Sequence, residues 1–103
     1  MTPAGRRLQA VLGFLSLSAA EPELALLHVW LDGWRGVGLL AVGLHRIGYD
    51  LDLRQYGHGH WRASLYVTGF AHSILGGSAW EATAWRAVQR AGWDAVQHAE
   101  RNL

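Results

Sequence analysis

The spacing of apolar residues along the chain changes from helical to alternating near Tyr49. Before that point apolar residues recur every three or four positions, as in Leu8, Leu12 and Leu15, which is the period of an amphipathic helix. After it they alternate with polar residues in YDLDLRQ and in WRASLYVT, the period of a half-buried strand. The pattern predicts an α+β fold with three parts: mainly helical 1–48, a three-stranded antiparallel meander over 49–76, and a long amphipathic helix over 78–101 packed on one face of the sheet.

The N-terminal segment allows two interpretations. Arg6-Arg7 followed by LQAVLGFLSLSAA has the charged and apolar sections of a secretory signal, with Ser18-Ala19-Ala20 as a cleavage site. The same residues form an apolar stripe at helical spacing from Leu8 to Ala19, with polar residues elsewhere. The stripe favours a retained helix.

Two further helices are predicted before the sheet. Glu21-Pro22-Glu23 opens the first, because proline suits the first helical turn and carboxylates complement the positive end of the helix dipole. The segment VGLLAVGLHRIG, ending at Gly48, resumes the helical pattern after several glycines. A buried strand is the alternative for this segment, and a helix is preferred.

The sheet is predicted to begin with a hairpin joined by the loop QYGHGHWR, whose glycines supply the backbone freedom of a turn. Phe70 to Leu75 is predicted as the third strand. Gly76-Gly77-Ser78 then ends the sheet, and Ser78-x-x-Glu81 has the spacing of a capping box at the start of the last helix. One face of that helix is apolar and small, and the other carries arginines.

Composition indicates one folded domain and excludes cysteine-based sites, but it does not select one function. A length of 103 residues with 50% apolar and 17% charged residues fits one folded domain. The net charge of +1 gives little general attraction to nucleic acid, and all nine basic residues are arginine, which matches a bacterial-like compositional bias. Cysteine is absent, which excludes disulfides and thiolate sites. Charged residues interrupt every apolar run before about 20 residues, so no membrane span is expected and a cytoplasmic location is predicted.

The stretch from about Tyr49 to Ala91 resembles a double-stranded-RNA-binding domain. That family has a Gly-Pro-x-His pattern in its first hairpin, where this chain has Gly57-His58-Gly59-His60, and a last helix that opens with a small-residue turn, as in Gly76 to Thr83 here. The resemblance implies the same fold and a loop that contacts the minor groove through His60. Where the family has phosphate-binding lysines, this chain has Ala79, Trp80 and Thr83.

The paired loop histidines raise the question of a metal site. In an extended loop His58 and His60 point to one side, a spacing that can offer two imidazoles to zinc, nickel or copper. A metal site also needs a third ligand and groups that fix the ring orientations. The pair is interpreted as an exposed turn, and no metal or other cofactor is expected.

The polar side of the predicted hairpin is a second candidate surface. It carries Arg54 and Arg62 together with tyrosines and two aspartates. A solvated face with cross-strand ion pairs is one interpretation. In the other, the tyrosines stack on bases and the arginines hold phosphates, joined by Arg86 and Arg90 of the last helix in one positive surface.

Six tryptophans are unusual for this length and suggest an aromatic surface as well as an aromatic core. Trp80 and Trp93 fall off the main apolar stripe of the predicted last helix. Each can close the core from the side or belong to an interface with a protein partner.

An enzyme is not predicted, because no serine stands in a G-x-S-x-G context and no residues suggest a small-molecule substrate. The sequence favours a non-catalytic binding domain. Nucleic-acid binding through the hairpin and the arginines is the first hypothesis. A protein-interaction or homodimerisation module that uses a Trp-rich helical surface is the alternative, and histidine-based metal binding is the third.

Overall fold

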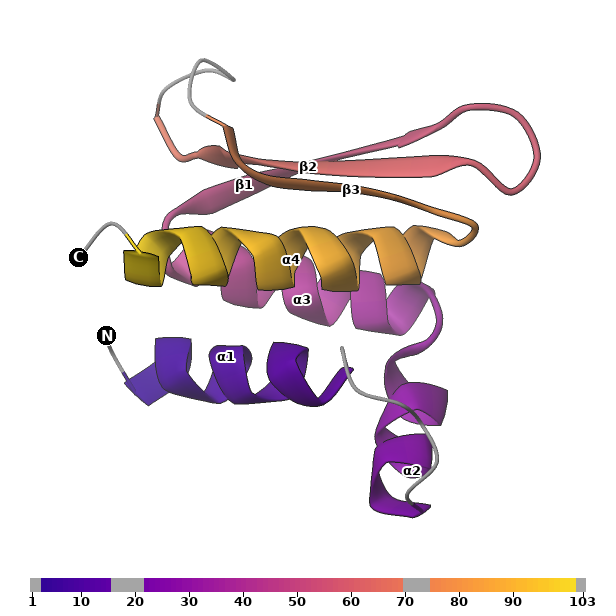
Figure 1. Ribbon diagram of the computed structural model, residues 1–103, viewed down its shortest axis with the longest axis horizontal. Helices are drawn as coiled ribbons and strands as arrows, with labels where there is room; N and C mark the ends of the chain where they lie inside the picture. Colours follow the sequence, from indigo (N-terminus) through magenta and orange to yellow (C-terminus); the bar gives the residue numbers. More distant parts are fainter. Residues whose placement is uncertain (1–2, 16–21, 70–74, 102–103) are drawn as a thin grey trace.

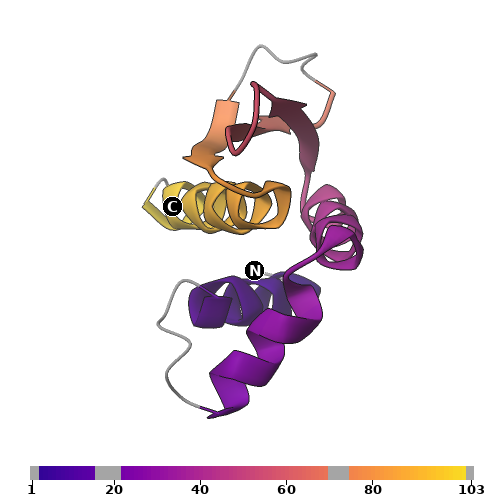
Figure 2. The same ribbon diagram turned by 90° about the vertical axis from the view of Figure 1, so that its right-hand side faces the viewer.

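The fold is an α+β arrangement in which helices lie on one face of a three-stranded antiparallel sheet (Figure 1). The computed structural model describes residues 3–15, 22–69 and 75–101. Below the sheet lies a layer formed by α3 and α4, and α1 and α2 lie on the side of these helices away from the sheet (Figures 1 and 2). The predicted α+β class is therefore confirmed. The elements are α1 (Pro3–Leu15), α2 (Pro22–Leu31), α3 (Trp34–Arg46), β1 (Tyr49–Gln55), β2 (Trp61–Val67), β3 (Leu75–Glu81) and α4 (Ala84–Arg101).

The helices before the sheet follow the predicted order. The second begins at Pro22, as the proline and its flanking carboxylates indicate. The third runs from Trp34 to Arg46, so the segment VGLLAVGLHRIG is mostly helical, and the alternative of a buried strand is wrong. The predicted stripe of the first helix is described as far as Leu15, and Ala19 lies outside the described residues. Within the part of the chain that the structure describes, no helix combines the length and apolarity needed to cross a membrane.

The sheet has the order β1-β2-β3, and its pairing fixes which residues share a face. Arg54 pairs with Arg62 across β1 and β2, and Arg62 pairs with Trp80 across β2 and β3. The β2–β3 register shifts once, between Leu65 and Tyr66. Side chains alternate between faces along a strand, so Arg54, Arg62 and Trp80 all lie on the face away from the helices.

The change from strand to the last helix comes later in the chain than the sequence pattern predicts. The third strand was predicted over Phe70–Leu75, and residues 70–74 lie outside the described part of the chain. The predicted end of the sheet at Gly76-Gly77-Ser78 is wrong, because β3 spans Leu75–Glu81 and includes these residues. The helix predicted over 78–101 begins at Ala84, so the 49–76 limit of the meander is wrong as well. The Gly76 to Thr83 stretch that was compared with the helix start of double-stranded-RNA-binding domains therefore lies largely in a strand.

The reason for the misplaced boundary is the close approach of β3 to α4. A Cβ atom on Gly77 would lie 2.6 Å from the carbonyl oxygen of Ala91 and 2.7 Å from the amide nitrogen of Ala95. Both are backbone atoms that cannot move aside. Gly77 therefore makes room for the helix backbone, rather than ending the sheet in a turn.

The cap of α4 also differs from the predicted one. The backbone N–H of Arg86 donates to Oγ1 of Thr83 at 3.3 Å, so Thr83 satisfies a free donor of the first helical turn. The backbone N–H of Ser78 instead donates to the carboxylate of Asp94 at 3.2 Å. Ser78 is an edge-strand residue held to the side of α4.

The core lies between the sheet, α3 and α4, with α1 closing it from the far side. The predicted apolar and small-residue stripes of the last helix are buried: Ala84, Ala87, Val88, Ala91, Ala95 and Val96. Leu12, Leu44 and Leu65, from α1, α3 and β2, are completely buried with them. Short side chains on α4 let three elements approach it closely, which is why glycine and alanine dominate this helix face.

Candidate functional site

The outer face of the sheet, which no described helix covers, carries an aromatic and basic cluster (Figure 1). We define the sheet-face cluster as Tyr56, Trp80, Arg62 and Arg54. Trp80 and Tyr56 are 54% and 44% exposed, and their ring centroids lie 5.0 Å apart at a tilt of 49°. The guanidinium carbon of Arg62 lies 5.7 Å from the centroid of the Trp80 ring, within the range of a cation–π interaction.

The hairpin loop brings Tyr56 to this cluster. The N–H of Tyr56 donates to the carbonyl of His60 at 2.7 Å and closes the loop. Gly57 and Gly59 have φ angles of 73° and 70°, a conformation that glycine adopts without strain. His58 and His60 are exposed at the tip. The predicted turn is thus present, with both histidines accessible at one end of the cluster.

The two arginines of the cluster have different electrostatic surroundings. Nε of Arg54 lies 3.2 Å from Oδ2 of Asp52, and this hydrogen bond, with the charge of Asp52, raises the pKa of Arg54. Arg62 is half-buried over Trp80 and forms no ion pair with any described residue. Arg62 therefore keeps an unbalanced positive charge beside an exposed aromatic ring.

The other aspartate of this face has local partners as well. Oδ1 of Asp50 lies 3.0 Å from Nδ1 of His45 and accepts a hydrogen bond from Oγ1 of Thr68 at 3.2 Å. Asp50 and Asp52 are the two carboxylates that oppose anion binding on this face. Asp50 lies at the end of β1 away from the hairpin loop, and the charge of Asp52 is balanced by Arg54, so neither carboxylate leaves an unbalanced negative charge beside Trp80.

Arg86 and Arg90, predicted to extend the positive surface, belong to α4 on the opposite side of the sheet. Nη2 of Arg86 donates to Oδ2 of Asp32 at 2.7 Å, and Arg90 pairs with Glu81. Both charges are balanced by carboxylates, as that of Arg54 is by Asp52, so it is their position that separates them from the cluster. The structure brings Arg54 and Arg62 together near the two loop histidines, and it does not bring Arg86 or Arg90 to them.

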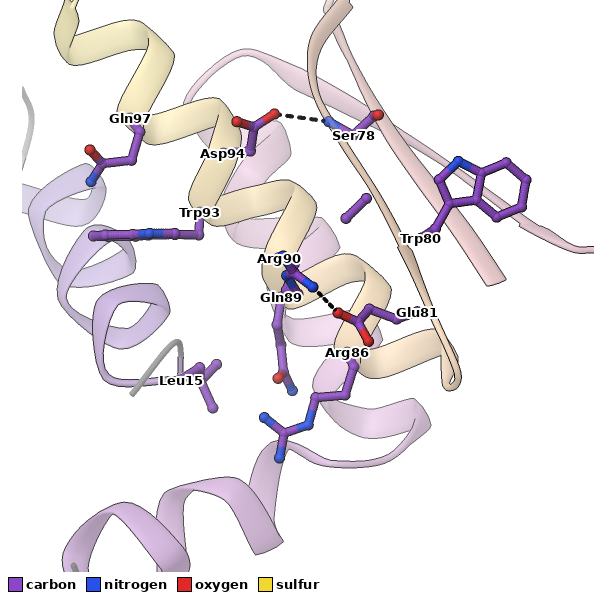
Figure 3. A pocket seen from close by; sticks show the side chains of 11 residues that line it. Leu15, Ser78, Trp80, Glu81, Arg86, Gln89, Arg90, Trp93, Asp94 and Gln97 are labelled. Atoms are coloured by element: carbon purple, nitrogen blue, oxygen red, sulfur yellow. Dashed lines mark hydrogen bonds and ion pairs between the residues drawn. The ribbon is translucent and has the colours of Figure 1, made fainter. Parts of the chain in front are cut away.

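Trp93 lies beside a groove between α4, the free side of β3 and Leu15 of α1. The groove has a volume of about 790 Å³, and Arg86, Gln89 and Arg90 contribute to its wall. Figure 3 shows Trp93 extending toward α1, whereas Trp80 points away on the other side of β3. A Cβ atom on Gly13 would lie 3.3 Å from the Trp93 ring, so this tryptophan packs against α1. Both predicted interface residues therefore line this groove, but their rings point in different directions.

A metal site at His58 and His60 requires a third ligand. Within the described residues, no three histidine, cysteine, aspartate or glutamate side chains are arranged to hold an ion. His58 and His60 thus lack a third described ligand.

The place of Trp80 is the feature that sequence reasoning missed. It was expected on a helix, and it stands on the outer face of β3 opposite Arg62. The signal was available in part, because Ser78 and Trp80 alternate with the small residues Gly77 and Ala79. This alternation is short, and the glycine pair with the Ser-x-x-Glu spacing predicts a helix start at the same residues.

Comparison with known proteins does not assign the chain to a group. No protein-family model matches it, and neither a curated protein nor a solved structure matches at the significance required.

Proposed function

We propose that the sheet-face cluster binds single-stranded nucleic acid. Tyr56 and Trp80 stack on bases, and Arg62 and Arg54 contact the neighbouring phosphates. The observation that supports this proposal is the exposed Tyr56–Trp80 pair with the guanidinium of Arg62 beside it, which forms no ion pair with the residues that the structure describes. Aromatic rings on an open sheet, flanked by arginine, are the usual elements of single-strand recognition.

Single strands suit this surface better than a duplex. Bases in a duplex are stacked on each other and cannot reach rings that lie on a sheet, whereas unpaired bases can. The resemblance to double-stranded-RNA-binding domains assigns duplex contact to His60 and to lysines that this chain lacks. His58 and His60 stand at the end of the cluster, where they can hydrogen-bond to a strand that leaves it.

The charge of the chain sets the expected character of binding. With a net charge of +1 there is little long-range attraction to phosphates. Stacking then provides most of the affinity, and few counterions are released. For single strands each phosphate contact contributes a slope of about −0.7 in a plot of log affinity against log salt. Two arginine contacts predict a shallow slope of about −1.4.

The test measures fluorescence anisotropy of labelled single-stranded DNA and RNA of about 10 nucleotides, within the site size of known single-strand modules. Trp80→Ala is expected to weaken binding by about 1–3 kcal/mol, or roughly 5- to 150-fold, because it removes one stacked base. Arg62→Ala is expected to weaken binding and to reduce the salt slope by about 0.7.

Two variants serve as matched controls. Trp30→Ala removes a tryptophan of similar exposure from α2, and Arg46→Ala removes an exposed arginine from α3. Neither should change the affinity. Equal weakening by Trp80→Ala and Trp30→Ala would contradict the proposal, as would the absence of single-strand binding. Tighter binding of duplex RNA that depends on His60 would instead assign the function to the loop.

A further inference from the structure

Most of the exposed large apolar residues described in the structure lie on α2 and α3, and α2 is on the side of the helical layer away from the sheet (Figures 1 and 2). Between Glu23 and Asp32 the sequence of α2 is LALLHVWL, with no residue that is charged at every pH. Leu26, Val29 and Trp30 are spaced by three and four residues, so they share one helix face. All three are exposed, by 71%, 79% and 56%.

The next helix, α3, also exposes apolar residues. The core side of α3 carries Val37, Leu40 and Leu44, whereas Leu39 and Val42 project outward and are 47% and 54% exposed. We define the α2–α3 patch as Leu26, Val29, Trp30, Leu39 and Val42. A helix that is apolar on all sides is normally buried on all sides. Among the α2 side chains whose burial the structure describes, His28 and Leu31 are buried, whereas Leu26, Val29 and Trp30 are exposed.

The patch is large enough for a stable interface. If the full surface of a large apolar residue is taken as about 200 Å², the five exposed fractions correspond to roughly 600 Å². A standard interface buries about 800 Å² on each partner. About 65% of a homodimer interface is apolar, which is roughly 500 Å² on each side. The patch alone supplies that amount.

The chemistry of the patch identifies the occupant. Helices that lie on membranes carry lysine or arginine along their polar face, and α2 has neither. A surface without charges is complementary to itself, so a two-fold arrangement gives each apolar side chain an apolar neighbour and leaves no ion pair to satisfy. Arg35 and Arg46, exposed on α3 on either side of Leu39 and Val42, fit the polar rim of such an interface.

We propose that a second copy of this chain covers the α2–α3 patch, forming a symmetric homodimer. This interface is separate from the sheet-face cluster, which stays exposed in both copies. The inference does not depend on the proposed nucleic-acid binding.

The test measures the mass of the 103-residue chain by light scattering over about 1 µM to 1 mM, the range of moderate affinities. A species of twice 11.4 kDa is expected at the higher concentrations. Val29→Glu and Val42→Glu should each yield a monomer, because each places a carboxylate inside the apolar interface. Both side chains are exposed, so the far-ultraviolet circular dichroism of the variants should equal that of the parent.

Tyr56→Ala and Trp80→Ala are the matched controls, because they remove exposed aromatic rings from the other face and should leave the dimer intact. A dimer that these variants break, but that survives Val29→Glu, would overturn the proposal. A parent chain that stays monomeric over the whole range would also overturn it. In that case, binding to phosphatidylcholine vesicles with or without anionic lipid would identify a membrane surface as the occupant.

Discussion

At the scale of single residues, Asp32 forms polar contacts that link the α2–α3 junction to α4. It lies between α2 and α3, and its carboxylate accepts hydrogen bonds from Arg86 at 2.7 Å and from Gln89 at 3.0 Å, both on α4. Gln89 is buried, and its Oε1 has no partner among the described residues. One carboxylate thus fixes the α2–α3 junction against the last helix.

Replacing Asp32 by alanine is expected to destabilise the fold by about 1–3 kcal/mol, because the partly buried Arg86 and the buried Gln89 amide both lose their acceptor. Urea unfolding followed by circular dichroism measures this change. Asp52→Ala is the matched control, because it removes an aspartate–arginine pair from the exposed sheet face and should lower stability far less. Equal losses in the two variants would show that the Asp32 contacts contribute no more than a surface pair.

At the scale of elements, the contact between β3 and α4 decides where the chain changes from strand to helix. Gly77 allows the two backbones to approach, and the carboxylate of Asp94 binds the N–H of Ser78 on the free edge of the strand. An unpaired edge is a site for unwanted strand pairing, and a carboxylate that occupies its donor reduces that tendency. Here a helix both packs below the sheet and covers part of its edge.

Gly77→Ala tests this contact, and Gly38→Ala is a comparison at a helix position without close neighbours. Gly77→Ala is expected to destabilise by about 1–3 kcal/mol, because its Cβ would overlap the backbone of α4. Gly38→Ala in α3 is expected to stabilise by about 0.5–1 kcal/mol, because its Cβ would meet no atom within 4 Å and alanine favours a helix. Thermal unfolding of the two variants measures the expected loss of stability in the first and the gain in the second. A Gly77→Ala variant that is as stable as the parent would contradict the close contact between β3 and α4.

At the scale of the whole molecule, α1 joins the helices that carry the sheet. Leu12 is completely buried, and a Cβ atom on Gly92 of α4 would lie 3.2 Å from its methyl groups and 3.5 Å from a methyl group of Leu44 in α3. The radius of gyration is 13.0 Å, the value expected for one domain of about 100 residues. The N-terminal helix and the sheet are therefore predicted to unfold together.

Leu12→Ala tests this cooperativity. A buried leucine-to-alanine change costs about 2–5 kcal/mol, because it removes apolar contacts and leaves a cavity. If the chain is one domain, the free energy of unfolding should fall by that amount both in the helical circular-dichroism signal and in the amide exchange of β2. Loss of helical signal at lower urea, with the β2 amides still protected, would show that α1 unfolds separately from the sheet.

Part of the candidate site was predictable from sequence. The alternation in β1 and β2 placed Arg54 and Arg62 on one polar face, and the glycines placed His58 and His60 in a turn. Trp80 was not predictable in the same way, because a glycine pair followed by Ser-x-x-Glu is as typical of a helix start as of a closely packed strand. The dimer surface on α2 carried a signal in the sequence, namely a helix without a polar face.

The sequence by itself determined the α+β class, the first hairpin and the buried face of the last helix. Each of these follows from a local period, because burial on one side of an element repeats with the geometry of that element. Tertiary structure alone decided that Gly77 meets Ala91, that Trp80 lies beside Tyr56, and that Arg86 binds Asp32 from 54 positions away. These contacts join residues distant in the chain, and no local pattern records which distant backbone or charge will lie opposite a given side chain.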